Sequence, residues 1–171
     1  MNLDIQNLDL GIQILFPQKN NDKRGFVSEI LRNDWKEFFD SDFPQQINVS
    51  KSNPGVIRAW HRHSRGQIDY FLVQKGTMKI CAYDADMNSD SCGKLVEIIA
   101  DEKEFKIVKI PGHLWHGTMT ISKFPSETLY FLTNLYDYQN PDEERLDYDS
   151  AEIIDPKTKK PYQWIKSEKL N

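Results

Sequence analysis

The strongest constraint on the fold is a rhythm of short apolar or alternating segments separated by turn residues. GVIRAW, IDYFLV, TMKICAYDAD, KLVEIIA, FKIVKI and TLYFLTNLY follow one another between residues 55 and 136. Brief, turn-bounded runs that alternate with a period of two are typical of antiparallel strands. The sequence therefore predicts an all-β domain whose barrel core spans about residues 46–135.

Turns are expected between these strands, and helices only at the periphery. QKG at 74–76 indicates a hairpin between IDYFLV and TMKICAY, and ADMNSDSCG at 85–93 indicates a longer polar loop before KLVEII. One helix is expected within residues 28–39. The tail from residue 140 carries prolines and charges. We therefore expect it to form turns with short helices laid over the barrel.

Composition limits the classes of function. A chain of 171 residues, 39% of them hydrophobic, suits a single domain covering residues 1–171. Its 22 basic and 26 acidic side chains form no long run of one sign, which argues against nucleic-acid or membrane-surface binding. The N-terminus lacks the pattern of a signal peptide, and no segment is apolar enough to cross a bilayer, so we expect a cytoplasmic protein.

All four histidines lie in two short segments, RAWHRHSRGQIDYF and PGHLWHG. His61 and His63 are two residues apart, which places both side chains on one face of a strand. Such a pair, together with His116 in the second segment, favours a functional cluster over scattered surface residues. We expect His113 to be structural.

The spacing of these histidines resembles the motifs of the cupin superfamily. The first motif, G-x5-H-x-H, is matched from Gly55 to His63, and PGHLWH resembles the second, with His116 pointing inward. In metal-binding cupins an acidic residue stands seven positions before a closing glycine, as Asp69 does before Gly76. The resemblance implies a double-sheet jelly-roll barrel with its site inside and a few short peripheral helices.

Five blocks extend a more specific resemblance over nearly the whole chain. In order they are DKRGFVSE, QINVSKSNPGVIRAWH, IPGHLWHG, LYFLTNLY and LDYDS. They resemble the dTDP-4-dehydrorhamnose 3,5-epimerase family, cupin enzymes that act on nucleotide-linked 4-keto sugars without a metal. The resemblance implies an isomerase of dTDP-rhamnose or other cell-surface polysaccharide biosynthesis, cytoplasmic and homodimeric through its N-terminal segment, with a nucleotide-sugar substrate and no cofactor.

The family's catalytic residues fall on three positions of this chain. The resemblance places the base on His61, its carboxylate partner on Asp149 and the proton donor on Tyr136. A proton next to a ketone is acidified because the carbanion delocalises into an enolate, and a histidine that titrates near neutral pH can remove it. Return of a proton from the opposite face by a phenol would invert the stereocentre. The 3,5-, 3- and 5-epimerase variants of this chemistry all remain open.

The resemblance also implies a set of substrate-binding residues. Some contact the nucleotide and diphosphate, one stacks near the base, and two reach across a dimer interface. The set comprises Arg24, Phe26, Glu29, Gln46, Asn48, Arg58, His116 and the position of Asp69. An arginine suits a diphosphate because its planar fork donates two charge-assisted hydrogen bonds at once. Arg24 and Glu29 are the pair expected to reach across the dimer interface.

Two substitutions depart from the family pattern. Asp69 stands where the family has a lysine that neutralises the enolate oxygen, and His63 replaces a glutamine. At an effective dielectric constant near 20, a carboxylate about 4 Å from an enolate costs roughly 4 kcal/mol, where a lysine would gain about as much.

Both substitutions introduce metal ligands, which leaves two alternatives open. His61, His63, Asp69 and His116 together suit one divalent ion, Fe, Mn, Ni or Zn. The first alternative is therefore a metal-dependent cupin enzyme, such as a dioxygenase or a metal-assisted isomerase. The second is a non-catalytic sugar-nucleotide-binding cupin, in which Asp69 disables the site.

Overall fold

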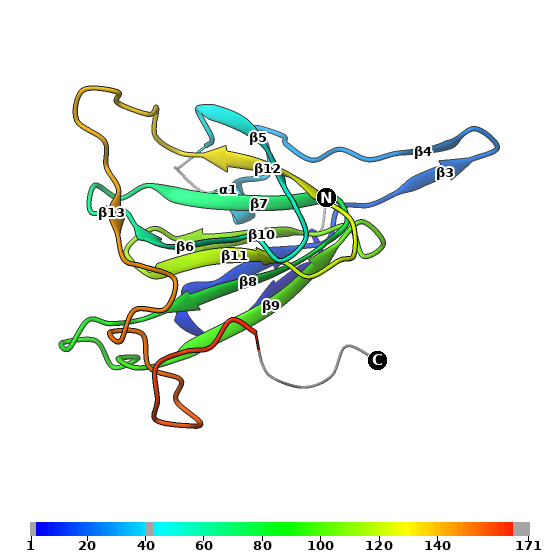
Figure 1. The fold of residues 1–171 in the computed structure, drawn as a ribbon. Helices are drawn as coiled ribbons and strands as arrows, with labels where there is room; N and C mark the ends of the chain where they lie inside the picture. Colours follow the sequence, from blue (N-terminus) through cyan, green and yellow to red (C-terminus); the bar gives the residue numbers. More distant parts are fainter. Residues whose placement is uncertain (1–2, 40–42, 166–171) are drawn as a thin grey trace.

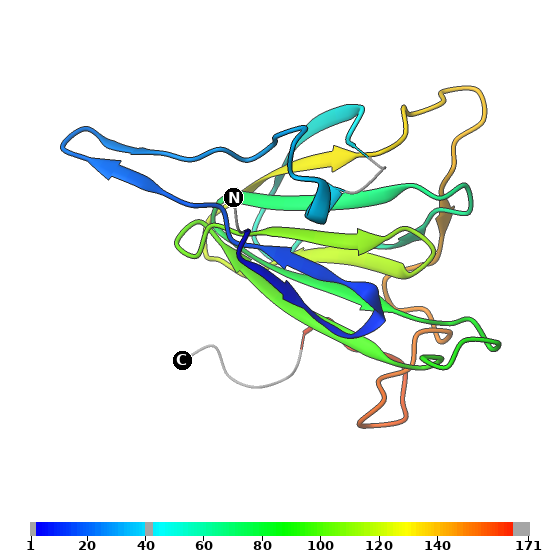
Figure 2. The ribbon, with the colours of Figure 1, turned by 180° about the vertical axis from the view of Figure 1, so that it is seen from behind.

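A computed structural model describes residues 3–39 and 43–165 and shows two antiparallel sheets packed face to face (Figures 1 and 2). The first sheet has the order β1 (Ile5–Asn7), β2 (Gln13–Leu15), β10 (Ile107–Pro111), β7 (Ile68–Lys75), β12 (Ser126–Leu132) and β5 (Gln46–Ser52). The second has the order β13 (Glu144–Arg145), β6 (Ile57–Arg62), β11 (Trp115–Thr120), β8 (Thr77–Tyr83) and β9 (Leu95–Asp101). β3 (Asn20–Asp22) and β4 (Gly25–Val27) pair with each other as an arm that extends away from the sheets.

The all-β prediction is confirmed, but helices are fewer and strands more widespread than expected. Within residues 28–39 only α1 (Lys36–Phe39) is helical, and η1 (Asp9–Gly11) is a single 3-10 turn. The tail forms turns and β13 rather than short helices in its described part, up to residue 165. β1 and β2 add an N-terminal edge to the first sheet, outside the expected core of 46–135.

The predicted hairpin at QKG is wrong, whereas the predicted loop at 85–93 is confirmed. β7 and β8 meet at Gly76 but lie in different sheets, so this turn is a corner between the sheets. Gly76 has a φ of +78°, and a Cβ there would meet the Cα of Ser126 at 3.0 Å. A tight glycine turn can join two paired strands or lead the chain from one sheet to the other, with the same local sequence in both cases. Only the pairing of the strands distinguishes a hairpin from a corner. The 85–93 loop does join the paired strands β8 and β9.

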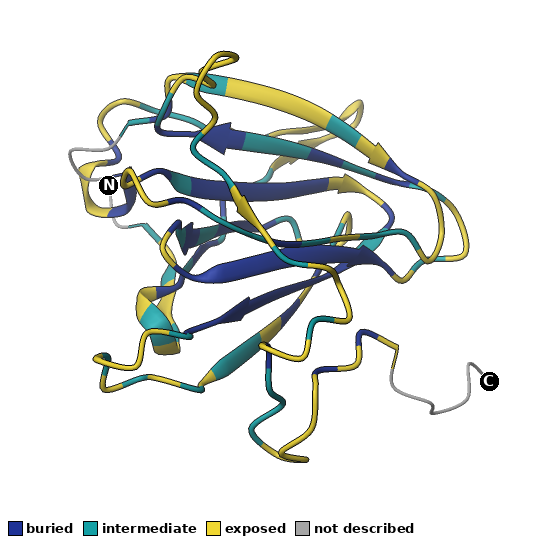
Figure 3. Cartoon of the chain, turned by 60° about the vertical axis from the view of Figure 1, so that its left-hand side comes forward, coloured by how far each residue is buried: buried dark blue, intermediate teal, exposed yellow. Residues whose placement is uncertain are grey.

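Period-two alternation sends the side chains of each central strand into two different cores. On β7, Phe71 and Val73 face the space between the sheets, whereas Tyr70 and Leu72 pack outward against the segment around α1. Figure 3 shows the buried residues concentrated in the central strands, with exposed residues in the arm and loops. Because both faces are covered, β7 and β8 read as nearly continuous apolar runs.

The C-terminal tail covers the outer face of the second sheet. Trp60 and Trp115 point outward there and pack with Tyr162 and Trp164 from the tail. Since neighbouring residues in a strand face opposite sides, the next residue of each strand points into the barrel. The tryptophans thus anchor the strands that carry the inward histidines. No helix among the described residues is long and apolar enough to span a membrane.

Candidate active site

Four polar side chains converge between the two sheets, as the histidine spacing predicts. His61 on β6 and His116 on β11 are directly paired across the second sheet, with ring centroids 4.2 Å apart. His63 follows the end of β6, and Asp69 on β7 approaches from the first sheet. One nitrogen or oxygen atom from each of the four side chains lies within 4.8 Å of those of the others.

A bulge in β6 turns both His61 and Arg58 toward the interior. Two residues of β6 stand between the paired positions of Arg58 and His61, opposite Gly117 alone on β11. An extra residue shifts the alternation, so two side chains three positions apart share one face. The bulge approaches so closely that a Cβ on Gly117 would lie 2.2 Å from that of Ala59.

Asp69 is the centre of the hydrogen-bond network in this cluster. Its Oδ2 lies 3.0 Å from Nε2 of His116 and 3.3 Å from Nε2 of His63. Its Oδ1 accepts a hydrogen bond of 2.7 Å from the amide of Gln67, whose nitrogen is also 3.1 Å from Nε2 of His63. The Nδ1 atoms of both histidines face backbone carbonyl oxygens, of Leu114 for His116 and of Asp142 for His63.

Burial and these contacts set the charge of the cluster. Burial alone would raise the pKa of Asp69, but its hydrogen bonds with His116 and His63 outweigh burial and hold the pKa well below its ordinary value. Burial, followed by the proximity of His116, holds the pKa of His61 well below its ordinary value. His61 is therefore a neutral imidazole at neutral pH, the form that can accept a proton.

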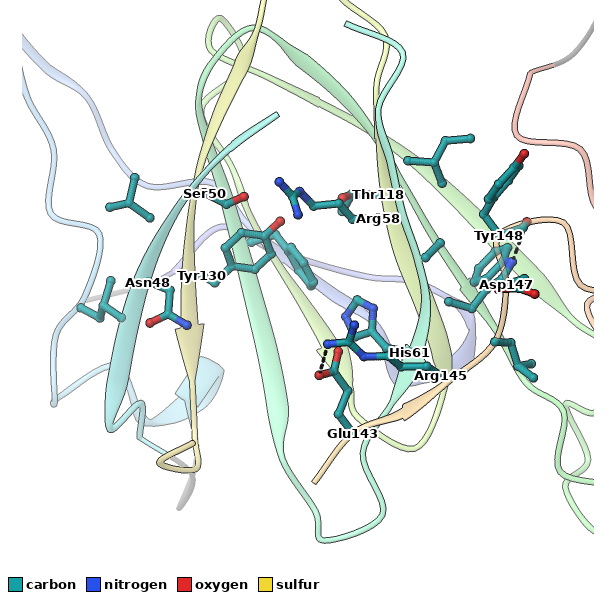
Figure 4. A pocket seen from close by; sticks show the side chains of 17 residues that line it. Asn48, Ser50, Arg58, His61, Thr118, Tyr130, Glu143, Arg145, Asp147 and Tyr148 are labelled. Carbon is teal, nitrogen blue, oxygen red and sulfur yellow. Dashed lines mark hydrogen bonds and ion pairs between the residues drawn. The ribbon is translucent and has the colours of Figure 1, made fainter. Parts of the chain in front are cut away.

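Two adjoining cavities open onto His61. The larger, of 1110 Å³, is lined by Arg58, Tyr130 and Arg145 among others (Figure 4). The smaller, of 460 Å³, reaches Asp69 and Tyr136. His61 lines both cavities, as do Asn48 and Glu143, so a molecule that fills the two would pass directly over this imidazole.

Several residues predicted to bind substrate do lie at these cavities. Arg58 lines the larger one, with its Nε donating to Oγ of Ser52 at 2.9 Å. Gln46 does not line either cavity but holds two residues that do. Its amide donates to Oδ1 of Asn48 at 3.0 Å, and its Oε1 accepts from the backbone N–H of Tyr136 at 2.9 Å.

The arm residues lie away from both cavities of their own chain. Arg24, in the β3–β4 turn, pairs with Asp22, and Glu29 pairs with Arg32 at 2.6 Å. Phe26 on β4 is half exposed and packs edge-on against Phe105. Arg24, Phe26 and Glu29 therefore contribute nothing to the two cavities of their own chain.

The predicted contact between His61 and Asp149 is not present. Asp149 is exposed in a turn, lines neither cavity and, within residues 3–39 and 43–165, has no hydrogen bond or ion pair with His61. The segment is fixed further along β6, where the Trp60 indole donates to the carbonyl oxygen of Tyr148 at 3.2 Å. The carboxylate that joins the histidine cluster is that of Asp69.

Three residues of the larger cavity were not identified from sequence. Glu143 and Arg145 are brought over His61 by β13, and Arg145 donates to Glu143 at 2.7 Å (Figure 4). Tyr130 faces the cavity from β12, and burial raises the pKa of its phenol, which therefore stays protonated at neutral pH. In sequence, the alternation of β12 was the one available indication that Tyr130 faces inward.

Proteins of known class share this fold and this sequence. Residues 9–169 match the family model described as dTDP-4-dehydrorhamnose 3,5-epimerase. Agl13 of Haloferax volcanii, a probable low-salt glycan biosynthesis epimerase, is 43% identical over 132 residues, which cover 77% of this chain and 83% of that protein. The spore coat polysaccharide biosynthesis protein SpsL of Bacillus subtilis is 31% identical over 145 residues, 84% of this chain and 92% of that protein.

Solved structures of epimerases have the same fold as this chain. A dTDP-6-deoxy-D-glucose-3,5-epimerase from Legionella pneumophila, in complex with dTDP-4-keto-L-rhamnose, superposes with a TM-score of 0.79 at 25% identity, covering 89% of this chain and 81% of that one. The dTDP-4-dehydrorhamnose 3,5-epimerase of Sulfolobus tokodaii superposes with a TM-score of 0.77 at 28% identity, covering 91% of this chain and 87% of that one.

The double-sheet barrel with its polar cluster inside is thus a cupin-type fold. The chain belongs to the dTDP-4-dehydrorhamnose 3,5-epimerase family. It is accordingly an isomerase-class enzyme, a carbohydrate epimerase.

Proposed function

We propose that this enzyme epimerises a nucleotide-diphospho-4-keto-6-deoxy sugar by removing and returning a proton next to the ketone. The observation that carries the proposal is the position of His61, a neutral imidazole exposed to both cavities. Family membership supports the reaction class. The two relatives named for glycan and spore coat polysaccharide biosynthesis support a role in making a cell-surface polysaccharide.

In this mechanism His61 takes the α-proton and a tyrosine returns one from the opposite face. Tyr136 is the donor implied by the family resemblance, and it lines the smaller cavity with His61. Tyr130 is a second candidate, because its buried, protonated phenol lines the larger cavity. Either phenol is a weak acid that keeps its proton until the enolate needs it.

The larger cavity is the proposed site of the nucleotide diphosphate. Arg58 and Arg145 both line it, and two guanidinium groups suit the oxygens of a diphosphate. Asn48 lies where the two cavities join, so it is placed to hydrogen-bond the linkage between nucleotide and sugar.

A second copy of the chain is proposed to complete the site. Arg24, Phe26 and Glu29 lie on or beside the extended arm, and Val27 on the same arm is 71% exposed. On the edge strand β5, Val49 is 73% exposed beside the larger cavity. Exposed apolar side chains on an arm and an edge strand are typical of surfaces that pair. Light scattering at several concentrations tests for the dimer.

Solvent exchange tests the proposed reaction directly. The purified protein is incubated in D₂O with dTDP-4-keto-6-deoxyglucose, and deuterium at C3 and C5 is followed by NMR and mass spectrometry. We expect exchange at one or both carbons, with inversion at the carbons exchanged. The absence of exchange with any 4-keto-6-deoxy nucleotide sugar would overturn the proposal.

A further inference from the structure

Two separations between donor atoms of the cluster match those of ligands around one cation, and the ligand atoms of the whole cluster lie within 4.8 Å of one another. Nε2 of His116 and Nε2 of His63 lie 3.0 and 3.3 Å from the same oxygen, Oδ2 of Asp69. Two ligand atoms that are each about 2.1 Å from an ion lie about 3.0 Å apart at a right angle and about 3.4 Å apart at the tetrahedral angle. The observed separations fall within this range.

The outer sides of all three side chains are already held in the orientation that metal ligands need. Nδ1 of His116 is 2.8 Å from the carbonyl oxygen of Leu114, and Nδ1 of His63 contacts that of Asp142. A carbonyl oxygen only accepts, so each Nδ1 carries a proton, and an ion bound between the imidazoles and Asp69 would replace any proton that an Nε2 shares with the carboxylate. Gln67 donates a hydrogen bond to Oδ1 of Asp69, which leaves Oδ2 directed toward the two Nε2 atoms.

The charge of the cluster favours a cation as well. Asp69 is only 3% exposed, and the partners that can compensate its carboxylate in the described part of the chain are the imidazoles of His116 and His63, with no lysine or arginine among them. A buried carboxylate requires a compensating positive charge, and a divalent ion held by these side chains would supply it in place of a proton on an imidazole. Two imidazoles and a carboxylate are the ligands that bind divalent first-row transition ions with positions left open.

We infer that His63, Asp69 and His116 bind one divalent transition-metal ion, with His61 beside it. The inference deepens the proposed function and rests on it for the role of the ion. The family resemblance places Asp69 where the family has a lysine, and an ion held by Asp69 would supply a positive charge in place of that lysine. His61 lines both cavities and stays available as the base.

Metal content and metal titration test the site without any substrate. The protein is purified without chelator, and its metal is quantified by inductively coupled plasma mass spectrometry. A chelator-treated sample is then titrated with Mn²⁺, Co²⁺, Ni²⁺ or Zn²⁺ by calorimetry. We expect about one bound ion per chain. Co²⁺ should develop the visible absorption of a nitrogen- and oxygen-bound ion.

Matched variants separate this site from adventitious binding. His63→Gln restores the family residue and Asp69→Ala removes the carboxylate, and each should weaken binding at least tenfold. His113→Gln changes the exposed fourth histidine and should leave one ion bound. Circular dichroism and thermal melting verify that each variant is folded. A wild type that binds no stoichiometric ion, or a folded Asp69→Ala protein that binds as tightly as wild type, would overturn the inference.

The exchange assay keeps this inference distinct from the proposed function. Metal-depleted protein should lose most of its deuterium exchange and regain it on readdition of one equivalent of metal. Full exchange by metal-free protein would leave the epimerase proposal intact and overturn the role of the ion. A bound ion without exchange under any condition would overturn the epimerase proposal and retain the site.

Discussion

His61 and His116 face each other as directly paired residues of β6 and β11, with their rings 4.2 Å apart. Each is preceded by a tryptophan, Trp60 or Trp115, that packs on the opposite side of the same sheet. The outward anchor and the inward imidazole are thus consecutive residues in both strands. Because the anchors are buried under the tail, the imidazoles lie on a rigid surface, which is what a positioned base requires.

Replacing His61 by asparagine removes the only group proposed to take the substrate proton. Asparagine retains a similar volume and polarity, so the barrel should fold, whereas proton transfer loses its acceptor. We expect deuterium exchange to fall by about 10²- to 10⁴-fold. His113→Gln should exchange at the wild-type rate. Exchange in His61→Asn within a factor of three of wild type would exclude His61 as the base.

Tyr130→Phe and Tyr136→Phe identify the proton donor. A variant without the donor still lets His61 exchange the α-proton on one face but no longer returns a proton to the other, so exchange should continue while inversion fails. We expect Tyr130→Phe to show the larger loss of inversion. The ring of Tyr130 packs on that of Phe71, with centroids 5.0 Å apart, whereas Tyr136 is 42% exposed. Nuclear magnetic resonance of the product measures both quantities. A larger loss of inversion in Tyr136→Phe than in Tyr130→Phe would assign the proton donor to Tyr136.

The histidine cluster was predictable because its information is local. Residues two apart in an extended segment share one face, and the second motif supplied the inward-pointing His116. Arg145 was not predictable, because β13 has two residues and its pairing with β6 is decided by contacts more than 80 positions apart. The QKG turn failed for the same reason, since the partner strands are not encoded in the turn itself.

The predicted site residues also differ in whether local sequence or long-range contacts decide their position. Arg58 and Asn48 lie on barrel strands, and both line the larger cavity. Asp149 follows a long loop, and one indole hydrogen bond to Tyr148 helps to decide where its turn lies. Sequence similarity aligns such a residue but does not fix its orientation.

Gly117→Ala should damage the β6 bulge and, through it, the site. The new Cβ would lie 2.2 Å from Cβ of Ala59, so the strands must separate. We expect the free energy of unfolding to fall by about 1–3 kcal/mol. Urea denaturation measures it. The double variant Ala59→Gly with Gly117→Ala removes the closest clash and should regain part of the loss, and a Gly117→Ala protein as stable as wild type would show that the bulge is not tightly packed.

Arg58→Lys should weaken substrate binding more than it slows the proton transfer. Arg58 donates Nε to Ser52 and Nη2 to the carbonyl oxygen of Lys51 at 3.4 Å while it lines the larger cavity, whereas a lysine offers one point charge for all of these contacts. Loss of a charge-assisted hydrogen bond of about 1.5–3 kcal/mol corresponds to a KM raised about 10- to 100-fold, with kcat changed much less. Arg62→Lys is the matched control, because Arg62 lies on the same strand, pairs with Glu144 at 2.7 Å and lines neither cavity. Steady-state kinetics of both variants should show the rise in KM for Arg58→Lys alone, and equal effects of the two would place the diphosphate elsewhere.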